Sequence, residues 1–419
     1  MTAACLAEHF EVIGCDPDSR TVSDLKAGHP PIFEPGLEEL VRSGIASGRL
    51  SFCENIGKAV ADADVVWITF DTTVNEDDTA DVAFVRGRLE DLFPFLADGS
   101  LVMISSQVPV GFTASAEASF QAAQSGRNVT FAYSPENLRL GKAIDAFCNP
   151  SRVITGVRDK TVRERLSKLF SPFCQTIEWM SVESAEMTKH ALNAFLATSI
   201  TFINELATLC ELTGADAHEV ARGLKSEPRI GPRAYLNPGG AFAGGTLARD
   251  VVFLNSIAKK NGVKTHVLPA VLSSNDEHKH WTERKLNQEL GTFAGKTIAV
   301  LGLTYKPGTN TLRRSTAVEL CVSLSEHGAH VRAFDPSVNK LPDELHGVFF
   351  LCNTPSEALR RADAVVVATE WPEFRTLLPA DLIEEMKSPI VVDPNTFLAA
   401  TLDKDGLRYF SVGKSTGIA

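Results

Sequence analysis

The 419-residue sequence contains no run of about 18 uncharged apolar residues, so it predicts no membrane-spanning helix. It also lacks a basic N-terminal segment followed by an apolar one, which is the pattern of a secretory signal. Basic residues are outnumbered, 41 to 52, and the net charge of −11 argues against nucleic acid as a partner. These absences predict a globular protein of the cytoplasm that binds neither a membrane nor nucleic acid.

Closely spaced cysteine pairs are missing as well. The eight cysteines are scattered through apolar segments without any C-x-x-C spacing. Metal sites usually need such spacing, and disulfide frameworks belong to oxidising compartments, so the sequence predicts buried free thiols and no metal site. With 44% hydrophobic and 22% charged residues, the composition is ordinary for a globular protein. The length predicts two or three domains.

A glycine-rich turn of the G-x-G-x-x-G type does not precede the first strand-like segment. Residues 1–8 are typical of the end of a helix, and residues 10–15 predict a short strand that ends at Asp16. In dinucleotide-binding βαβ units, an acidic residue at this strand end holds the ribose about 20 residues after such a turn. We expect Asp16 to favour NAD, because its charge would repel the 2′-phosphate of NADP. We also hypothesise that the natural start lies roughly 15–20 residues upstream.

Apolar runs alternate with helical segments through much of the chain. Strands are predicted over residues 62–71, 101–109, 128–134 and 151–156, and again over residues 297–301, 331–334, 364–368 and 390–393. Alternation of this kind predicts α/β domains with mostly parallel sheets. A linker is expected near residues 286–295, between the two groups of strands.

Between the two groups, residues 184–212 show helical periodicity without Pro or Gly. At about 1.5 Å per residue, this helix would be about 43 Å long. A helix of that length is expected to join two domains or to pack against a second copy of the chain.

Three features indicate chemistry, each beside a plainer interpretation. Lys189 and Asn193 share one helix face and could stabilise an oxyanion, or they could form a solvated surface. Glu136 follows a proline at a strand end, where α/β folds place ligands, or it is an exposed loop carboxylate. Residues 239–250 (GGAFAGGTLARD) allow close backbone approach before a helix that could hold an anion, or they form a flexible turn.

Three segments carry a resemblance to a known family: residues 239–250, 135–144 (PENLRLGKAI) and 301–310 (LGLTYKPGTN). They are similar to the UDP-glucose/GDP-mannose 6-dehydrogenase family of nucleotide-sugar dehydrogenases, and the similarity covers nearly the whole chain. The resemblance implies an α/β protein with two Rossmann-like parallel-sheet domains, joined by a long central helix and a helical dimerisation region. The expected domains span residues 1–182, 183–284 and 285–419. NAD, a nucleotide-sugar substrate and a homodimer or higher homo-oligomer are implied with them.

The resemblance also implies catalytic roles. In the family, the positions of Lys189 and Asn193 hold the oxygen on C6 of the sugar, and that of Asp250 orders the water or base that accepts the hydroxyl proton. The position of Glu136 serves as general acid/base in a thioester step. Where the family has the Cys that forms this thioester, the present chain has Thr246.

A threonine has no accessible anion without a dedicated base, whereas a cysteine thiolate adds readily to an aldehyde. The first oxidation needs no nucleophile, but the second would lose its covalent route. We therefore expect a 6-aldehyde product, slow oxidation to the acid through an aldehyde hydrate, or a different outcome on a different sugar.

Binding residues follow from the same resemblance. Those expected at the cofactor are Asp16, Thr72, Ser106, Gln107, Arg249 and Arg313. Those expected at the substrate are Asn137, Leu138, Arg229, Tyr235, Gly244 and Lys306. The chain departs from the family pattern at Gln107, Leu140, Arg314 and Asn395, the last standing where the family has a diphosphate-binding Arg.

These departures keep alternatives open. One is a catalytically silent homologue that still binds a nucleotide sugar. Another is a hydroxyacid dehydrogenase of the same fold, which explains less because it would not need a second α/β domain carrying Lys306.

Overall fold

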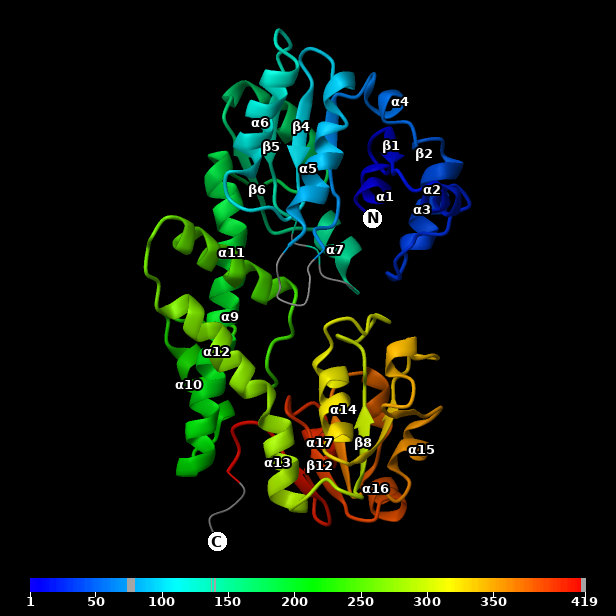
Figure 1. Ribbon diagram of the computed structural model, residues 1–419, viewed down its shortest axis with the longest axis vertical. Coiled ribbons are helices and arrows are strands. Elements are labelled where there is room, and N and C mark those ends of the chain that lie inside the picture. The colour runs from blue at the N-terminus through cyan, green and yellow to red at the C-terminus, as the bar shows by residue number, and fades with distance from the viewer. Residues whose placement is uncertain (74–79, 137, 139–140, 416–419) are drawn as a thin grey trace. The chain divides into compact units, whose positions relative to one another are not determined.

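The computed structural model describes residues 1–73, 80–136, 138 and 141–415 (Figure 1). The chain forms two compact units, Met1–Leu192 and Asn193–Ala419. The boundary falls inside one long helix, α9 (Val182–Thr213), which matches the helix predicted over residues 184–212. The division into domains at 1–182, 183–284 and 285–419 stays a prediction.

The first unit has two separate sheets among its described residues. β1 (Val12–Cys15) and β2 (Leu50–Cys53) form a parallel pair. The other sheet has the order β3-β4-β5-β6-β7, and its neighbours are parallel except β5 and β6. Its strands are β3 (Val65–Ile68), β4 (Leu101–Ile104), β5 (Thr130–Tyr133), β6 (Val153–Val157) and β7 (Ile177–Met180). All four strands predicted between residues 62 and 156 are present.

Both faces of the five-stranded sheet are covered. Val102 and Ile104 pack on one face with α5 (Val82–Glu90) and α6 (Phe112–Ala123), whereas Leu101 and Met103 pack on the other with α8 (Arg163–Phe170). Alternate residues of a strand point to opposite faces, so a continuous apolar run is what a sheet covered on both sides requires. The remaining helices of the unit are α1 (Thr2–Leu6), α2 (Ser19–Lys26), α3 (Leu37–Ala46), α4 (Ile56–Val60) and α7 (Ala143–Cys148).

A cavity of about 890 Å³ is lined by every residue of β1 and of β3. Among the described residues, β1 pairs with β2 alone and β3 with β4 alone, so each strand has one unpaired edge. The middle of β1 is correspondingly open, and 47% of the Ile13 surface is exposed. We call this cavity the β1–β3 slot.

The second unit contains a six-stranded parallel sheet with the order β10-β9-β8-β11-β12-β13. Its strands are β8 (Thr297–Leu301), β9 (His330–Phe334), β10 (Phe350–Leu351), β11 (Ala364–Val367), β12 (Ile390–Val392) and β13 (Arg408–Phe410). In β8, Ile298 and Val300 face one core and Ala299 and Leu301 the other. The first core includes α13 (Trp281–Leu290) and α14 (Thr316–Glu326). The second includes α15 (Pro355–Leu359), α16 (Pro379–Glu385) and α17 (Ala399–Leu402).

Three helices accompany the later part of α9: α10 (Ala217–Ser226), α11 (Thr246–Lys260) and α12 (Val267–Lys279). By length and composition, α9 could cross a membrane, but the core helix of a soluble protein meets the same two criteria. Its buried polar residues are held by protein groups. Glu186 bonds to Thr113, and Asn204 bonds to the backbone of Gly239. Such contacts are those of a helix packed within a globular protein.

Candidate functional site

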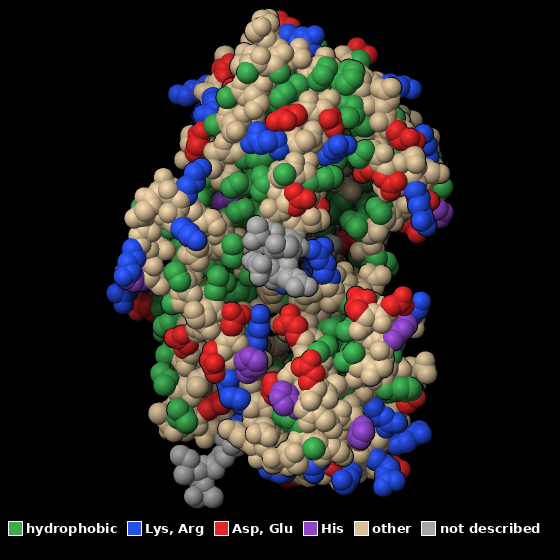
Figure 2. Space-filling model, viewed as in Figure 1, with side chains coloured by type: hydrophobic (Ala, Val, Ile, Leu, Met, Phe, Trp, Pro, Cys, Tyr) green, Lys and Arg blue, Asp and Glu red, His purple; other side chains and the backbone are tan. Residues whose placement is uncertain are grey.

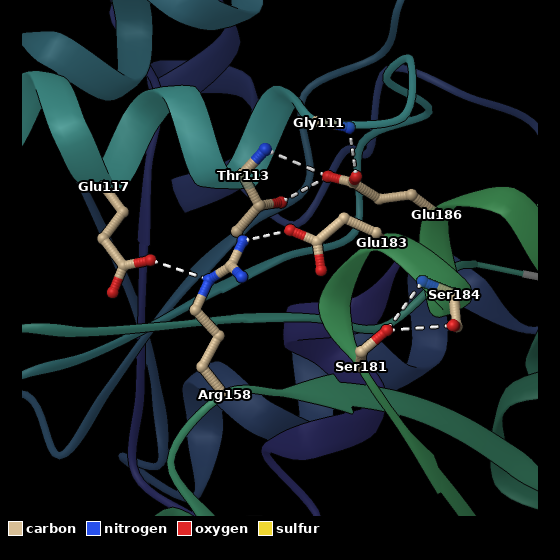
Figure 3. Close-up of polar contacts among 8 residues, drawn as sticks. All are labelled: Gly111, Thr113, Glu117, Arg158, Ser181, Glu183, Ser184 and Glu186. Atoms are coloured by element: carbon tan, nitrogen blue, oxygen red, sulfur yellow. Dashed lines mark hydrogen bonds and ion pairs between the residues drawn. The ribbon is translucent and has the colours of Figure 1, made fainter.

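The first turns of α9 are fixed by buried polar contacts (Figure 3). The Glu186 carboxylate accepts hydrogen bonds from the Gly111 amide (2.6 Å), the Thr113 amide (3.0 Å) and the Thr113 hydroxyl (2.7 Å). Burial raises the pKa of Glu186, and these hydrogen bonds oppose the rise. Arg158, just after β6, pairs with Glu183 of α9. The start of the helix is thereby tied to α6 and to the five-stranded sheet.

Lys189 lies one turn beyond these anchors. Its ammonium group donates a hydrogen bond to the main-chain oxygen of Glu136, at 2.7 Å. Glu136 follows β5 and is one of the residues that line the β1–β3 slot. Although this side chain is accessible, the atoms around the carboxyl displace much of its water. The pKa of Glu136 is raised by this desolvation, and the charge of Lys189 opposes the shift.

Asp16 comes directly after β1, as the sequence predicts for a ribose-binding carboxylate. Its carboxylate accepts a hydrogen bond from the Asp18 amide (2.9 Å), and its own amide donates to the carbonyl of Cys53 (3.3 Å). Asp16 and Glu136 both line the β1–β3 slot. A carboxylate at a strand end, beside an open cavity, fits the ribose of a dinucleotide.

Other predicted cofactor residues follow the next two strands. Thr72, after β3, and Ser106, after β4, are both 3% exposed, and Gln107 is half-buried. The Ser106 hydroxyl donates to the main-chain oxygen of Phe70 at 2.7 Å. This bond joins the carboxyl ends of β3 and β4, which is the edge where open α/β sheets bind ligands.

In the second unit, the side-chain amide of Asn193 donates a hydrogen bond to the Asp250 carboxylate. Asn193 is 4% exposed and Asp250 is fully buried. Thr246 begins α11 and lies four residues before Asp250, so the two share a helix face. The α9–α11 contact therefore places a buried carboxylate one turn from the exposed Thr246 side chain.

Side chains from α9 and α12 hold the loop before α11. The Gly239 amide donates to the Asn204 side chain (3.1 Å), and the Gly239 carbonyl is 2.8 Å from His278 Nε2. The Asn275 side chain bonds to both the amide and the carbonyl of Phe242, each at 2.9 Å. Burial lowers the pKa of His278, so its ring donates to Gly239 in the neutral form.

Asn395, after β12, supports the same loop. Its side-chain oxygen accepts a hydrogen bond from the Gly240 amide at 2.8 Å. A Cβ on Gly239 would lie 2.5 Å from that oxygen, and a Cβ on Gly244 would collide with the Arg314 guanidinium. Glycine at these two positions lets the Asn395 and Arg314 side chains approach the loop backbone this closely.

The Thr246 hydroxyl lies near enough to the phenol of Tyr305 to lower the pKa of that phenol. Although 37% of the Tyr305 surface is exposed, desolvation of its phenol raises the pKa of Tyr305, and the nearby Thr246 opposes this rise. Lys306 follows Tyr305 and is half-buried. This loop after β8 thus places a phenol beside the residue that stands where the family has its cysteine.

The remaining predicted residues are more scattered. Arg249 is largely buried on α11, Arg313 is exposed before α14, and Leu138 is half-buried. Arg229 is exposed and pairs with Glu227 at 2.7 Å. Tyr235 is 58% exposed. Asn137 and Leu140 lie outside the described residues.

In each unit, two of the predicted catalytic residues are joined by a hydrogen bond. Lys189 meets Glu136 in the first, and Asn193 meets Asp250 in the second. Sequence reasoning missed Tyr305, although it adjoins Lys306. It also missed the amides of Asn204 and Asn275 and the imidazole of His278, which hold the glycine-rich loop. Single Asn and His residues have no spacing that distinguishes them.

Neither the surface charges nor the distribution of potential metal ligands identifies a further site among the described residues. Figure 2 shows acidic and basic side chains interspersed over the viewed face. In the part of the chain that the structure describes, no group of three His, Cys, Asp or Glu residues is arranged to hold a metal ion.

Family models match the chain in three consecutive parts. The NAD binding domain of the UDP-glucose/GDP-mannose dehydrogenase family matches residues 1–174. The central domain of the family matches residues 183–277, and the UDP binding domain matches residues 299–400.

Similar proteins span almost the whole chain. A UDP-glucose 6-dehydrogenase of Rhizobium meliloti (strain 1021) is 36% identical over 423 residues, covering 99% of this chain and 97% of the relative. One of Pseudomonas aeruginosa is 35% identical, covering 99% and 95%. The solved structure of a UDP-glucose dehydrogenase from Pyrobaculum islandicum has a TM-score of 0.89 and 29% identity, covering 99% of this chain and 94% of that one.

Proposed function

The chain belongs to the UDP-glucose/GDP-mannose dehydrogenase family, and on this premise we propose that it oxidises the C6 primary alcohol of a UDP- or GDP-hexose with NAD. The relatives named UDP-glucose 6-dehydrogenase support UDP-glucose as the first substrate to test. The observation that carries the proposal is the buried Asn193–Asp250 pair beside Thr246. A carboxylate held in this way is suited to accept a hydroxyl proton.

The acidic and basic residues have different roles in this reaction. The Asp250 carboxylate takes the proton from the C6 hydroxyl, directly or through one water, while the Asn193 amide holds that carboxylate in place. The Lys189 ammonium stabilises the oxygen as negative charge develops on it. NAD, when bound, supplies the hydride acceptor. Asp16 would hold its ribose, and the residues proposed around the rest of NAD are Thr72, Ser106, Gln107, Arg249 and Arg313.

Thr246 limits the second oxidation. Its neighbour, the Tyr305 phenol, has a pKa raised by desolvation, so that phenol is unsuited to act as a base at neutral pH. Without an activated nucleophile, no covalent adduct forms with the aldehyde. The product is the 6-aldehyde, or the acid made slowly from the aldehyde hydrate. The residues proposed to hold the nucleotide sugar are Asn137, Leu138, Arg229, Tyr235, Gly244 and Lys306.

The experiment is to incubate the full chain with NAD and UDP-glucose, and separately with GDP-mannose, while following reduced nicotinamide. Mass spectrometry of the nucleotide-sugar product then distinguishes aldehyde from acid. Turnover to aldehyde is the expected result. Tight binding of the nucleotide sugar without turnover would favour the alternative, a catalytically silent binding protein. That alternative is supported by Asn395, which holds Gly240 where the family has a diphosphate-binding Arg.

We further propose a homodimer, or a larger homo-oligomer, built on α9, in the cytoplasm. Phe195, Phe202 and Leu209 are spaced seven residues apart and are 69%, 48% and 56% exposed, and Leu212 is 72% exposed. Seven-residue spacing places apolar side chains along one helix face that another helix can cover. An exposed apolar face of this kind typically marks a protein–protein contact.

A further inference from the structure

Two cysteines face each other at the carboxyl ends of β1 and β2. The strand register pairs Gly14 with Phe52 and then Cys15 with Cys53. A Cβ on Gly14 would lie 2.7 Å from the Phe52 ring, so these two residues share one face of the strand pair. Successive side chains alternate between faces, and both cysteine side chains therefore lie on the opposite face.

The two cysteines are neighbours across the strand pair, and both are accessible. The strand register places them opposite one another, and each residue is partly exposed. The Cys53 thiol donates a hydrogen bond to the carbonyl of Asn55 at 3.5 Å. Adjacent strands lie about 4.8 Å apart, which falls within the Cα separation of about 4.4–6.8 Å found in disulfides. Cys5 and Cys148 form a second neighbouring pair, but Cys5 is fully buried. Of these two pairs, only Cys15 and Cys53 offer an oxidant two accessible sulfurs.

We propose that Cys15 and Cys53 form a reversible dithiol–disulfide site that controls the ribose end of the dinucleotide site. The oxidant is a low-molecular-weight disulfide such as glutathione disulfide. One cysteine thiolate attacks it, forms a mixed disulfide and releases one glutathione thiolate. The second cysteine then displaces the other glutathione. Two protein thiols become one disulfide, and their two protons and two electrons are recovered in two glutathione thiols.

The disulfide would act through the backbone around Asp16. Cys15 directly precedes Asp16, and the Asp16 amide donates to the carbonyl of Cys53. A bond between the two sulfurs would therefore constrain both residues that hold the Asp16 backbone. This part of the inference rests on the proposed role of Asp16 in binding ribose. Oxidation is expected to weaken ADP-ribose binding by at least about fivefold, the lower end of typical coupling between linked sites.

The test uses the full chain incubated with glutathione disulfide and then mapped by non-reducing peptide mass spectrometry. Burial raises the pKa of Cys15 to about 11, so the incubation is carried out in mildly alkaline buffer to increase the thiolate. The expected result is a Cys15–Cys53 link, loss of two of the eight free thiols, and their return with dithiothreitol. Cys53→Ser should give only a glutathione adduct on Cys15, whereas the matched control Cys148→Ser should still form the link.

Two results would overturn the proposal: a wild-type map without the Cys15–Cys53 link, or equal ADP-ribose affinity in the mapped disulfide form and the reduced form. Calorimetry with ADP-ribose measures that comparison. Cys53→Ser treated with the same oxidant and then reduced should bind like the reduced wild type. Failure of ADP-ribose to bind even the reduced protein would contradict the role of Asp16 instead, and the peptide map would still decide whether the disulfide forms.

Discussion

The side-chain amide of Asn193 on α9 donates a hydrogen bond to the carboxylate of Asp250 on α11, and both side chains are buried. A buried carboxylate needs such a partner, because removal from water otherwise penalises its charged form. The bond thus serves two ends. It orients the Asp250 carboxyl group, and it ties the first turn of α11, which begins at Thr246, to α9.

Asp250→Asn is expected to remove most of the dehydrogenase activity, because an amide cannot accept the hydroxyl proton. Loss of a positioned general base typically lowers the rate by about 10²–10⁴-fold. Steady-state kinetics with UDP-glucose and NAD measures the effect. Asp276→Asn, at an exposed α12 site paired with Lys279, is the matched control and should keep full activity. Equal activity in the two variants would contradict the role of Asp250.

Thr246→Cys is expected to shift the product from aldehyde towards acid, because a thiolate can add to the aldehyde where a hydroxyl cannot. Product masses at equal turnover measure the shift. Thr246→Ala serves as the control and should still release aldehyde. If the wild-type chain makes acid as completely as Thr246→Cys, the limit placed on the second oxidation is wrong.

Because His278 is buried, the free energy of unfolding is expected to fall in acid. Burial lowers its pKa below the usual 6.5, so below pH 6.5 the unfolded chain binds a proton that the folded chain does not. Stability therefore falls as the pH drops from about 6.5 towards the lowered pKa. Melting temperature measured against pH should show a shallower fall in His278→Gln, whose amide can still donate to Gly239. His330→Gln, at an exposed position, should follow the wild type.

Phe202→Glu is expected to convert the oligomer to a monomer, because a charge in the middle of the α9 stripe would have to be buried unpaired in the contact. Size-exclusion chromatography with light scattering measures the mass. Ile383→Glu, on α16, replaces another exposed apolar residue outside the stripe and should leave the mass unchanged. A wild-type monomer would refute the proposed assembly outright.

The pattern of apolar residues in the sequence made much of the fold predictable. An uninterrupted helical period without Pro or Gly located α9 to within two residues at each end. Apolar runs located β4 and β8, because strands covered on both faces need apolar residues at every position. The antiparallel pairing of β5 with β6 was not predictable, since the same run of buried residues suits a strand in either direction.

The candidate site was predictable where motifs carried it and not elsewhere. Family-like spacing marked Lys189, Asn193 and Asp250, and the structure places each of them against a polar partner or a buried neighbour. Tyr305 and Thr246 are 59 positions apart in the sequence, and no local pattern indicates that they lie near each other. Contacts of this kind depend on how loops fold over one another, which periodicity does not encode.

The β1–β3 slot has a practical consequence for handling the protein. Exposed strand edges with free amide and carbonyl groups are templates for pairing with other chains. The purified protein should therefore precipitate or form soluble aggregates as its concentration rises. Infrared spectra should then show a stronger band from intermolecular β-sheet. Charged solubilising tags near β1 should slow this loss more than the same tags placed at the opposite terminus.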